Sequence, residues 1–393
     1  MFPRICKAPK TNSFFLFGAR GTGKTTWVQS VFSNEQTLYV NLLLPRVEQQ
    51  LSLRPDDLIG MVESKSPEWV IIDEVQKIPK ILDVVHHLIE SRKTKFVLTG
   101  SSARKLKGAG VNLLAGRAFL REMFPLTFQE IGKDVFDLSN ALHFGTLPKI
   151  FGFDSQQDKC EFLESYAHLF LREEIAAEQV VRKIDPFRKF LEVAAQANAR
   201  IVSHASIARA CGVDPKTVQT YFQILEDTHL GFILEPWIGS VRERVMRHPK
   251  FYFFDLGVTR ALARQLETRL NPSTSLYGDL FEQWMVLEVI RWARYSQRNI
   301  QIFYYQPHGG KEIDLVVSRP DCLPLLIEIK STEQVEERHI AALLSSGAHF
   351  EDATKLCVSR DPLAKVIAGV RCVPWQEFLE GLYSVPEDVL KPR

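Results

Sequence analysis

The stretch SFFLFGARGTGKTTWVQSVF, from Ser13 to Phe32, joins a short apolar run to a helical one through a glycine-rich loop. Its first five residues predict a buried strand, and the residues after Lys24 predict a helix. Because Gly18, Gly21 and Gly23 have no Cβ, nearby backbone N–H groups can turn inward around phosphate oxygens, and the helix N-terminus adds its positive dipole end. The stretch therefore predicts a phosphate-binding loop between a strand and a helix.

Side chains at the end of this loop suit a nucleotide with Mg²⁺. Lys24 is expected to reach the β and γ phosphates, and the Thr25 hydroxyl is expected to hold Mg²⁺. A glycine-rich turn without a ligand is the alternative, and the complete motif in this context argues against it. The residues predicted to bind ATP are Gly18, Ala19, Arg20, Gly21, Thr22, Gly23, Lys24, Thr25 and Thr26.

A second apolar strand ends in acidic residues. EWVIIDE, from Glu68 to Glu74, predicts Asp73 in the Mg²⁺ shell and Glu74 as the residue that polarises a water. Two acids at a strand end also occur simply as solubilising residues. The next strand, VLTGSS, ends in hydroxyl side chains that are either γ-phosphate sensors or only a polar strand end, namely Thr99, Ser101 and Ser102.

The order of these motifs resembles one group of AAA-type ATPases. The segments that carry the resemblance are the loop and strand ends above, together with DEVQKIP, TGSSARKL, LLAGRAFLREMFPLTFQE and GTLP, which lie between Asp73 and Pro148. The sequence is similar to prokaryotic ATPases in which an AAA-type domain is fused to a C-terminal domain of the PD-(D/E)XK nuclease-like group. The likeness extends over nearly the whole chain.

The resemblance gives Arg117, in LAGR, a candidate role in catalysis. It would sense phosphate or act in trans on a neighbouring subunit, and the second role implies a homo-oligomer. A surface ion pair is the ordinary alternative. The chain departs from the family pattern in two places. GTLP stands where a second glycine is frequent, and LREEI, with Glu173 and Glu174, replaces an Arg-Asp pair.

Composition sets the broad class of the protein. With 393 residues, of which 45% are hydrophobic and 24% charged, a globular chain of two or three domains is expected. A net charge of +2 does not by itself indicate nucleic-acid binding, so any basic surface has to be local. Six cysteines lie far apart without zinc-type spacing, and neither a signal peptide nor a long apolar run occurs, which favours a cytoplasmic protein away from membranes.

Alternating strand and helix patterns predict an α/β protein with a connector in its middle. The boundaries expected are 1–128 for a P-loop AAA-type domain with a parallel sheet, 129–185 for a helical appendage, 186–237 for a winged helix-turn-helix, and 238–393 for a PD-(D/E)XK nuclease-like α/β domain. In YFFDLGVTRAL, Asp255 is expected to cap a helix rather than to act as a catalytic acid.

The expected winged helix offers a candidate surface for DNA. Asp214 and Pro215 suit the start of its third helix, and Gly212 suits the end of the second. The third helix carries Lys216, Thr217, Gln219 and Thr220 near its N-terminus, where base edges are usually read. This set is barely basic, so a lid or a subunit contact is an equal alternative. A basic run that could follow a phosphate backbone contains Arg242, Arg244, Arg247 and Lys250.

The stretch KEIDLVVSRPDCLPLLIEIK, from Lys311 to Lys330, places charges inside two apolar strands. Because strand side chains alternate between faces, Glu328 and Lys330 share one face, as do Glu312 and Asp314, and an antiparallel pairing would gather Asp314, Glu328 and Lys330. Half-buried ionised groups are costly unless they are paired or bind a metal. Mg²⁺ would relieve the carboxylate repulsion, and Lys330 would favour the charge on an attacked phosphate.

Asp314, Glu328 and Lys330 keep the core pattern of the PD-(D/E)XK group. The resemblance adds Glu282 from the preceding helix, in preference to Glu288. It implies metal-assisted phosphodiester hydrolysis in which Asp314, Glu328 and Lys330 are catalytic, and Glu282, Asp314 and Glu328 hold the metal. A salt-bridged cluster that has lost catalysis is the alternative.

Together these features predict an ATPase that uses ATP and Mg²⁺ and whose nucleotide cycle positions DNA against the C-terminal cluster or withholds it. The alternative is an ATP-dependent regulatory switch whose inactive nuclease fold engages DNA or a protein partner.

Overall fold

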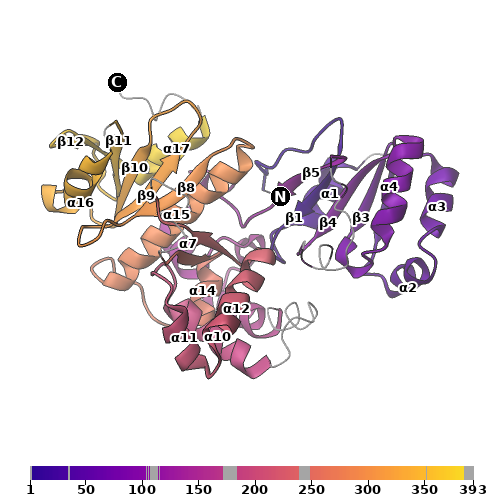
Figure 1. Cartoon of the computed structure of the whole chain (residues 1–393), viewed down its shortest axis with the longest axis horizontal. Coiled ribbons are helices and arrows are strands. Elements are labelled where there is room, and N and C mark those ends of the chain that lie inside the picture. The colour runs from indigo at the N-terminus through magenta and orange to yellow at the C-terminus, as the bar shows by residue number, and fades with distance from the viewer. Residues whose placement is uncertain are drawn as a thin grey trace.

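The computed structural model describes residues 2–33, 36–102, 104, 106, 114, 116–170, 184–238, 248–350 and 352–384. Figure 1 shows an N-terminal sheet domain on one side of the molecule, a C-terminal sheet domain on the other, and a group of helices below and between them. Within the described ranges, none of the helices combines the length and the apolar composition needed to cross a membrane.

The N-terminal domain is a five-stranded parallel sheet in the order β2-β3-β4-β1-β5. Because all five strands run the same way, their carboxyl ends meet at one edge, where ligands of open α/β sheets bind. The strands are β1 (Ser13–Phe17), β2 (Thr37–Asn41), β3 (Trp69–Asp73), β4 (Lys95–Gly100) and β5 (Ala118–Glu122). The helices are α1 (Lys24–Val31), α2 (Pro45–Leu53), α3 (Asp57–Lys65), η1 (Val75–Lys77) and α4 (Ile81–Arg92).

The helical middle packs below the two sheets (Figure 1). Its first part contains α6 (Phe128–Ile131), α7 (Leu138–Phe144), η2 (Pro148–Gly152), α8 (Gln156–Ser165) and the π-helical turn η3 (Tyr166–Phe170). Its second part contains α10 (Ile184–Gln196), α11 (His204–Cys211) and α12 (Pro215–Asp227), followed by the antiparallel hairpin of β6 (Gly231–Leu234) and β7 (Lys250–Phe253).

The caps predicted for the winged helix are confirmed. Asp214 precedes α12 and accepts a hydrogen bond from the backbone N–H of Thr217 at 2.9 Å. Gly212 ends α11 in the left-handed conformation, with φ +69°. The expected C-terminal domain begins at residue 238, but β7 pairs with β6, Gly231 opposite Phe253, and the two strands form the hairpin that we call the wing.

The C-terminal domain is a six-stranded mixed sheet in the order β12-β13-β11-β10-β9-β8. Its strands are β8 (Gln301–Tyr305), β9 (Ile313–Ser318), β10 (Leu325–Lys330), β11 (Thr354–Ser359), β12 (Lys365–Ile367) and β13 (Val370–Pro374). Its helices are α15 (Ser275–Tyr295), η4 (Glu337–Ile340), α16 (Ala341–Ser345), η5 (Ser346–His349) and α17 (Trp375–Ser384), whereas α14 (Leu256–Leu262) lies in the helical middle (Figure 1). β9 and β10 are antiparallel, with Leu315 opposite Ile327, and this register brings Asp314 beside Glu328.

The helical middle and the C-terminal domain share one hydrophobic core. It runs from Phe124 through Phe190 of α10 and Phe222 of α12 to Trp284 of α15 and Leu379 of α17. The N-terminal sheet instead has a core of its own on each face. The winged helix is therefore continuous with the C-terminal domain in packing, whereas the N-terminal sheet packs mainly on cores of its own.

Candidate phosphate and carboxylate sites

The predicted phosphate loop lies at the carboxyl edge of the N-terminal sheet, between β1 and α1. Gly21 and Gly23 adopt φ values of +80° and +93°, which residues with a Cβ rarely adopt. Lys24 folds back over the loop, and its Nζ donates hydrogen bonds to the carbonyl oxygens of Gly18 at 2.7 Å and Ala19 at 3.1 Å. The buried Lys24 ammonium thus lies at the centre of the loop, surrounded by backbone peptide groups.

Asp73 is the acceptor at the centre of a hydroxyl network beside this loop. Its Oδ2 accepts from the Thr25 hydroxyl at 2.9 Å and from the Tyr39 hydroxyl at 2.6 Å, and its Oδ1 accepts from the Thr99 hydroxyl. The pairing of a loop threonine with a strand-end carboxylate provides two hard oxygen ligands of the kind that Mg²⁺ prefers. The Thr25 hydroxyl and the Asp73 carboxylate fit a magnesium ion, and both are residues that the sequence motifs predict for this role.

Glu74 stands at the next position in an unusual backbone conformation. Its φ is +63°, uncommon for a residue with a Cβ, and such strain is often found at functional sites. Its N–H donates to the Thr99 hydroxyl at 3.2 Å, and Gln76 of η1 links the Glu74 carboxylate to the Ser101 hydroxyl. Thr99 in β4 therefore contacts both Asp73 and Glu74, and Ser101 after β4 is linked to Glu74 through Gln76. The Ser102 hydroxyl instead accepts from the backbone N–H of Arg104.

Residues outside the sequence motif brace the loop. Arg4, in the segment before β1, donates to the carbonyl oxygen of Thr22 at 2.8 Å, and the Tyr166 hydroxyl donates to that of Arg20 at 2.8 Å. Pro148 of η2 lies against Gly23. The GTLP segment and the helical middle thus contact the phosphate loop directly. Sequence reasoning missed Arg4 and Tyr166 because neither belongs to a local pattern.

A cavity of about 810 Å³ opens beside the loop. Its walls come from the segment before β1, from the first turns of α1 and from η2, so a ligand there would touch both the N-terminal domain and the helical middle. The residues that line it include Phe2, Pro3, Arg4, Cys6, Gly23, Thr26, Trp27, Pro148 and Phe151. Its mainly apolar walls and its position next to the phosphate loop suit the base and sugar of a nucleotide.

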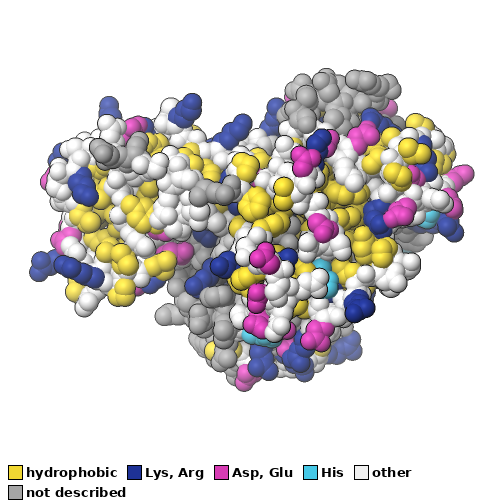
Figure 2. Space-filling model, turned by 180° about the vertical axis from the view of Figure 1, so that it is seen from behind, with side chains coloured by type: hydrophobic (Ala, Val, Ile, Leu, Met, Phe, Trp, Pro, Cys, Tyr) yellow, Lys and Arg dark blue, Asp and Glu magenta, His cyan; other side chains and the backbone are white. Residues whose placement is uncertain are grey.

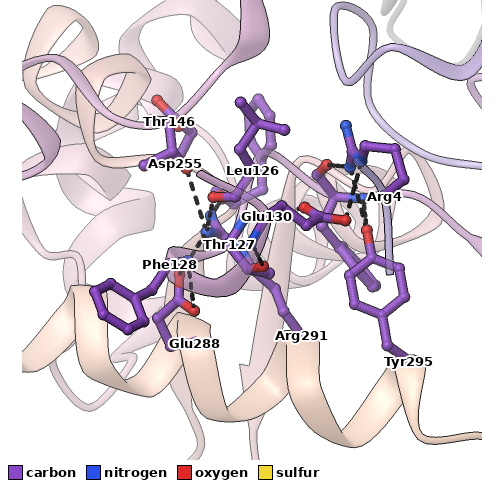
Figure 3. Close-up of polar contacts among 12 residues, drawn as sticks. Arg4, Leu126, Thr127, Phe128, Glu130, Thr146, Asp255, Glu288, Arg291 and Tyr295 are labelled. Carbon is purple, nitrogen blue, oxygen red and sulfur yellow. Dashed lines mark hydrogen bonds and ion pairs between the residues drawn. The ribbon is translucent and has the colours of Figure 1, made fainter. Parts of the chain in front are cut away.

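Arg4 also belongs to a buried group of polar side chains, which Figure 3 shows between the N-terminal domain and α15. Its guanidinium pairs with Glu130 at 3.0 Å and donates to the Tyr295 hydroxyl at 3.2 Å and to the carbonyl oxygen of Phe124 at 2.6 Å. Because Tyr295 is the last residue of α15, this group ties the phosphate loop to the longest helix of the C-terminal domain.

The same group continues along α15. Arg291 pairs with Glu288 at 3.3 Å and donates to the carbonyl oxygen of Phe254 at 3.0 Å (Figure 3). Glu288 is fully buried and accepts from the N–H of Phe128, and burial raises its pKa to about 7 although Arg291 opposes this shift. Asp255 accepts from the N–H groups of Val258 and Thr146, so the predicted helix cap is confirmed and also holds the GTLP segment. We name Arg4, Glu130, Glu288, Arg291 and Tyr295 the polar hub.

The C-terminal strands bring charged residues together as the alternation predicts. Lys330 Nζ lies 2.6 Å from Glu328 Oε1 and 3.7 Å from Asp314 Oδ2. Asp314 Oδ2 also accepts from the N–H of Ile329 at 2.6 Å. The other oxygen of Glu328, Oε2, is buried and has no hydrogen-bond partner among the described residues. A buried carboxylate oxygen without a donor suits a bound cation.

Glu282 of α15 joins the same cluster, and so does Glu312, which the sequence analysis did not include among the metal ligands. Carboxylate oxygens of Glu282, Glu312 and Asp314 lie within 4.8 Å of one another. Burial, followed by the charge of Asp314, raises the pKa of both Glu282 and Glu328. We name Glu282, Glu312, Asp314, Glu328 and Lys330 the carboxylate cluster. Its hard oxygen donors fit Mg²⁺ or Mn²⁺.

Lys250, the first residue of β7, reaches into this cluster from the wing. Its side chain is 5% exposed, its ammonium forms an ion pair with Glu312, and it lies 3.6 Å from Glu282. A pocket of about 470 Å³ leads to these groups between the winged helix and α15. Its walls include Asn198, Arg200, Lys250, Asp279, Glu282 and Glu312. In the sequence, Lys250 is instead part of the predicted basic run.

Arg117 lies away from the phosphate loop of its own chain. It precedes β5, whose first residue is level with Ser13 at the start of β1, whereas the loop follows the end of β1. Its guanidinium pairs with Glu90 on the outer face of α4. A contact to the phosphates of the same chain is excluded by this position, and only action in trans stays a prediction.

The start of α12 presents exposed polar side chains. Lys216, Gln219 and Thr220 are exposed and Thr217 is half-buried. Figure 2 shows Lys and Arg side chains at the lower end of the molecule, where Figure 1 places α10 to α12. The other end of α12 is docked, because Asp227 pairs at 2.8 Å with Arg104, which follows β4. Glu173, Glu174, Arg242, Arg244 and Arg247 lie outside the described residues.

The sheet order and the phosphate loop define a P-loop protein of the α/β class, and comparison with known proteins agrees. Residues 10–132 match the family model of an AAA domain. Residues 135–269 and 277–378 match models of two domains of unknown function, DUF8612 and DUF4143. The N-terminal domain is thus similar to an AAA domain, and the segments that match the other two models follow it.

Relatives share most of this arrangement. Uncharacterized proteins of Mycobacterium bovis and Mycobacterium tuberculosis are each 27% identical to this chain over 324 residues, which is 81% of the chain and 70% of each relative. An uncharacterized protein of Haemophilus influenzae is 23% identical over 331 residues, covering 77% of this chain and 79% of the relative.

Proposed function

We propose that the N-terminal domain binds and hydrolyses ATP. The observation that carries this proposal is the 2.9 Å hydrogen bond between the Thr25 hydroxyl and Asp73, directly beside the glycine loop and Lys24. Thr25 and Asp73 would hold Mg²⁺, which neutralises phosphate charge when bound. Lys24 would leave the loop carbonyls for the β and γ phosphates, Glu74 would orient the attacking water, and the cavity of about 810 Å³ would receive the nucleoside.

Two variants test this proposal by separating binding from hydrolysis. Lys24→Met should lose both, because the variant removes the charge that meets the phosphates. Glu74→Gln should keep nucleotide affinity and lose turnover by about a hundredfold or more, as expected for removal of a general base. Lys65→Met, an exposed lysine of α3, is the control. Phosphate release and fluorescent-nucleotide binding are the measurements. Hydrolysis that survives Lys24→Met overturns the proposal.

For the C-terminal domain we propose metal-assisted phosphodiester hydrolysis on DNA that the winged helix binds. Support comes from the carboxylate cluster and from its pocket, one wall of which belongs to the winged helix. Glu282, Asp314 and Glu328 would hold the metal, which supplies an activated water when bound. Lys330 would stabilise charge on the attacked phosphate. ATP turnover would change the contacts of the helical middle and so regulate access of DNA to the cluster.

A second candidate is a nucleotide-dependent switch in which the cluster no longer cleaves DNA. The observation that favours it is the ion pair of Lys250 with Glu312, because this ammonium already compensates part of the charge that a metal would meet. Wild type, Glu74→Gln and Asp314→Asn should be incubated with linear, branched and single-stranded DNA, ATP, and Mg²⁺ or Mn²⁺. Cleavage lost in Asp314→Asn alone supports the nuclease. DNA binding without cleavage under every condition supports the switch.

A further inference from the structure

The carboxylate cluster already holds a cation that the chain itself supplies. Lys250 pairs with Glu312 and lies 3.6 Å from Glu282, and these are two of the three carboxylates that could hold a metal ion. The Lys250 ammonium also lies 5.5 Å from the centre of the Tyr304 ring. Two carboxylates and an aromatic ring form an environment that favours a small cation, and the Lys250 ammonium takes up this position.

A metal ion and this ammonium need the same oxygens. A divalent cation on Glu282, Glu312 and Asp314 would stand within a few ångströms of the present position of the Lys250 Nζ. Two like charges at about 4 Å repel by several kcal/mol even at an effective dielectric constant of about 20. The cluster cannot hold both cations in this arrangement, so metal entry requires the lysine side chain to move.

The wing keeps the backbone of Lys250 fixed while its side chain has room to leave. Lys250 pairs with Leu234 in the hairpin, and the preceding His248 accepts a hydrogen bond at its carbonyl from the Tyr304 hydroxyl at 2.7 Å. Lys250 also lines the pocket of about 470 Å³ that opens between the winged helix and α15. The long side chain can therefore swing into this pocket without unpairing the strand.

We propose that Lys250 is a built-in competitor of the divalent metal, and that Glu312 joins Glu282, Asp314 and Glu328 as a metal ligand once the Lys250 side chain has swung into the pocket. This rests on the proposed metal site of the C-terminal domain. It adds that a negatively charged ligand in the pocket, such as a DNA phosphate, draws Lys250 away from the carboxylates and thereby admits the metal. The metal site then forms only where DNA is present.

Direct binding of Mn²⁺ alone tests this inference without DNA, nucleotide or catalysis. The affinity of the intact protein for Mn²⁺ is measured by calorimetry and electron paramagnetic resonance. Lys250→Met should bind Mn²⁺ about tenfold or more tightly than wild type, because one repelling charge is gone. Lys250→Arg should stay as weak as wild type, because it keeps the charge. Lys365→Met removes a matched lysine that pairs with Asp361 outside the cluster, and should change nothing.

Two further variants identify the ligands and the background. Glu312→Gln in the Lys250→Met protein should cancel the gain in affinity. Asp314→Asn reports the Mn²⁺ that binds elsewhere, including at Thr25 and Asp73. Circular dichroism verifies that each variant is folded, and Lys250→Gln, which also removes the charge and should also bind Mn²⁺ more tightly, carries the comparison if Lys250→Met is not.

The outcomes separate this inference from the proposal on which it rests. Equal affinity of wild type and Lys250→Met, abolished in both by Asp314→Asn, leaves the metal site in place and overturns the role of Lys250. Mn²⁺ binding no stronger than the Asp314→Asn background in every protein overturns both. A Lys250→Arg protein that binds as tightly as Lys250→Met also overturns the competition, because charge would then not be its cause.

Discussion

Arg4 is the residue at which the nucleotide site and the C-terminal domain meet. It donates to the phosphate loop at the Thr22 carbonyl and pairs with Glu130, whose side chain is completely buried. A charged group buried to this extent is stable only with its partner, because removal of one partner leaves the other charge uncompensated. Arg4 therefore has both a structural contact and a contact with the phosphate loop.

The pairing of Arg4 with Glu130 yields a double-mutant prediction. Arg4→Met should destabilise the protein by about 3–5 kcal/mol, because Glu130 then keeps only the N–H groups of Ile5 and Thr127 as donors. Glu130→Gln in the same protein should recover part of this loss, with a coupling energy of about 1–3 kcal/mol. Urea unfolding measures the stability, and nucleotide binding should weaken in parallel. Additive effects of the two changes would contradict the pairing.

Glu288 predicts a pH dependence of stability. Its folded-state pKa of about 7 lies above the ordinary value of 4.5, so the folded state binds more protons than the unfolded state between these pH values. The stability that Glu288 contributes is thus complete below pH 4.5 and is lost as the pH rises towards 7. Between pH 5.5 and 8 wild type should lose about 2 kcal/mol more than Glu288→Gln does.

Urea unfolding at these two pH values, followed by tryptophan fluorescence, measures this difference. Glu161→Gln, an exposed glutamate of α8, is the control and should keep the wild-type slope. Identical slopes for wild type and Glu288→Gln would show that Glu288 remains ionised beside Arg291.

At the scale of elements, α15 connects the two candidate sites. It carries Glu282 near its start and Tyr295 at its end, which are about 20 Å apart along a helix that rises 1.5 Å per residue. Between them, Glu288 and Arg291 are fixed by backbone groups of the helical middle. A movement of the phosphate loop that shifts Arg4 would therefore also act on α15, the helix that positions Glu282.

The exposed start of α12 predicts how DNA binding should respond to salt. Lys216 on α12 and Arg209 on α11 are exposed. If each meets one phosphate, removal of each charge should reduce the slope of log affinity against log salt by about 0.9. Fluorescence anisotropy with a labelled duplex measures the slopes, and Lys365→Ala on β12 is the control. Unchanged slopes in both variants would assign DNA to another surface.

Local patterns predicted some elements of the site and not others. The glycine loop, the acids of β3 and the alternation of β9 and β10 all follow from spacing within one element, and the structure shows these residues where the patterns placed them. Glu312 shares the predicted face with Asp314, but its part in the cluster depends on Lys250. Lys250 depends on a hairpin whose strands are far apart in sequence, and Arg4 depends on packing between domains. Neither the contact of Lys250 with the carboxylate cluster nor that of Arg4 with Glu130 can be predicted from a periodic pattern in the sequence.

For the whole molecule, the position of Arg117 makes a prediction about assembly. Because it lies at the opposite edge of the sheet from the phosphate loop of its own chain, it can contribute to hydrolysis only from a neighbouring chain. Arg117→Ala should then lower turnover by about a thousandfold with nucleotide affinity retained. Activity per chain should also rise with protein concentration in wild type.

Arg92→Ala removes a matched exposed arginine, which pairs with Glu63, and should leave turnover unchanged. Sedimentation with ATP measures the assembly directly. A wild type that stays monomeric and whose activity per chain is independent of concentration would leave the Glu90 ion pair as the whole role of Arg117.

The shared hydrophobic core limits how the chain can be divided into fragments that fold by themselves. Phe128 and Phe136, which precede the winged helix, pack on Trp375 and Trp284 of the C-terminal domain, with ring centres 5.5 and 5.3 Å apart. A fragment of residues 277–378 alone would present both tryptophans to water and is expected to aggregate. Phe128 belongs to the first family segment and Phe136 to the second, so recombination that moved only residues 277–378 would leave the core incomplete. Selection should therefore keep the three segments together during evolution.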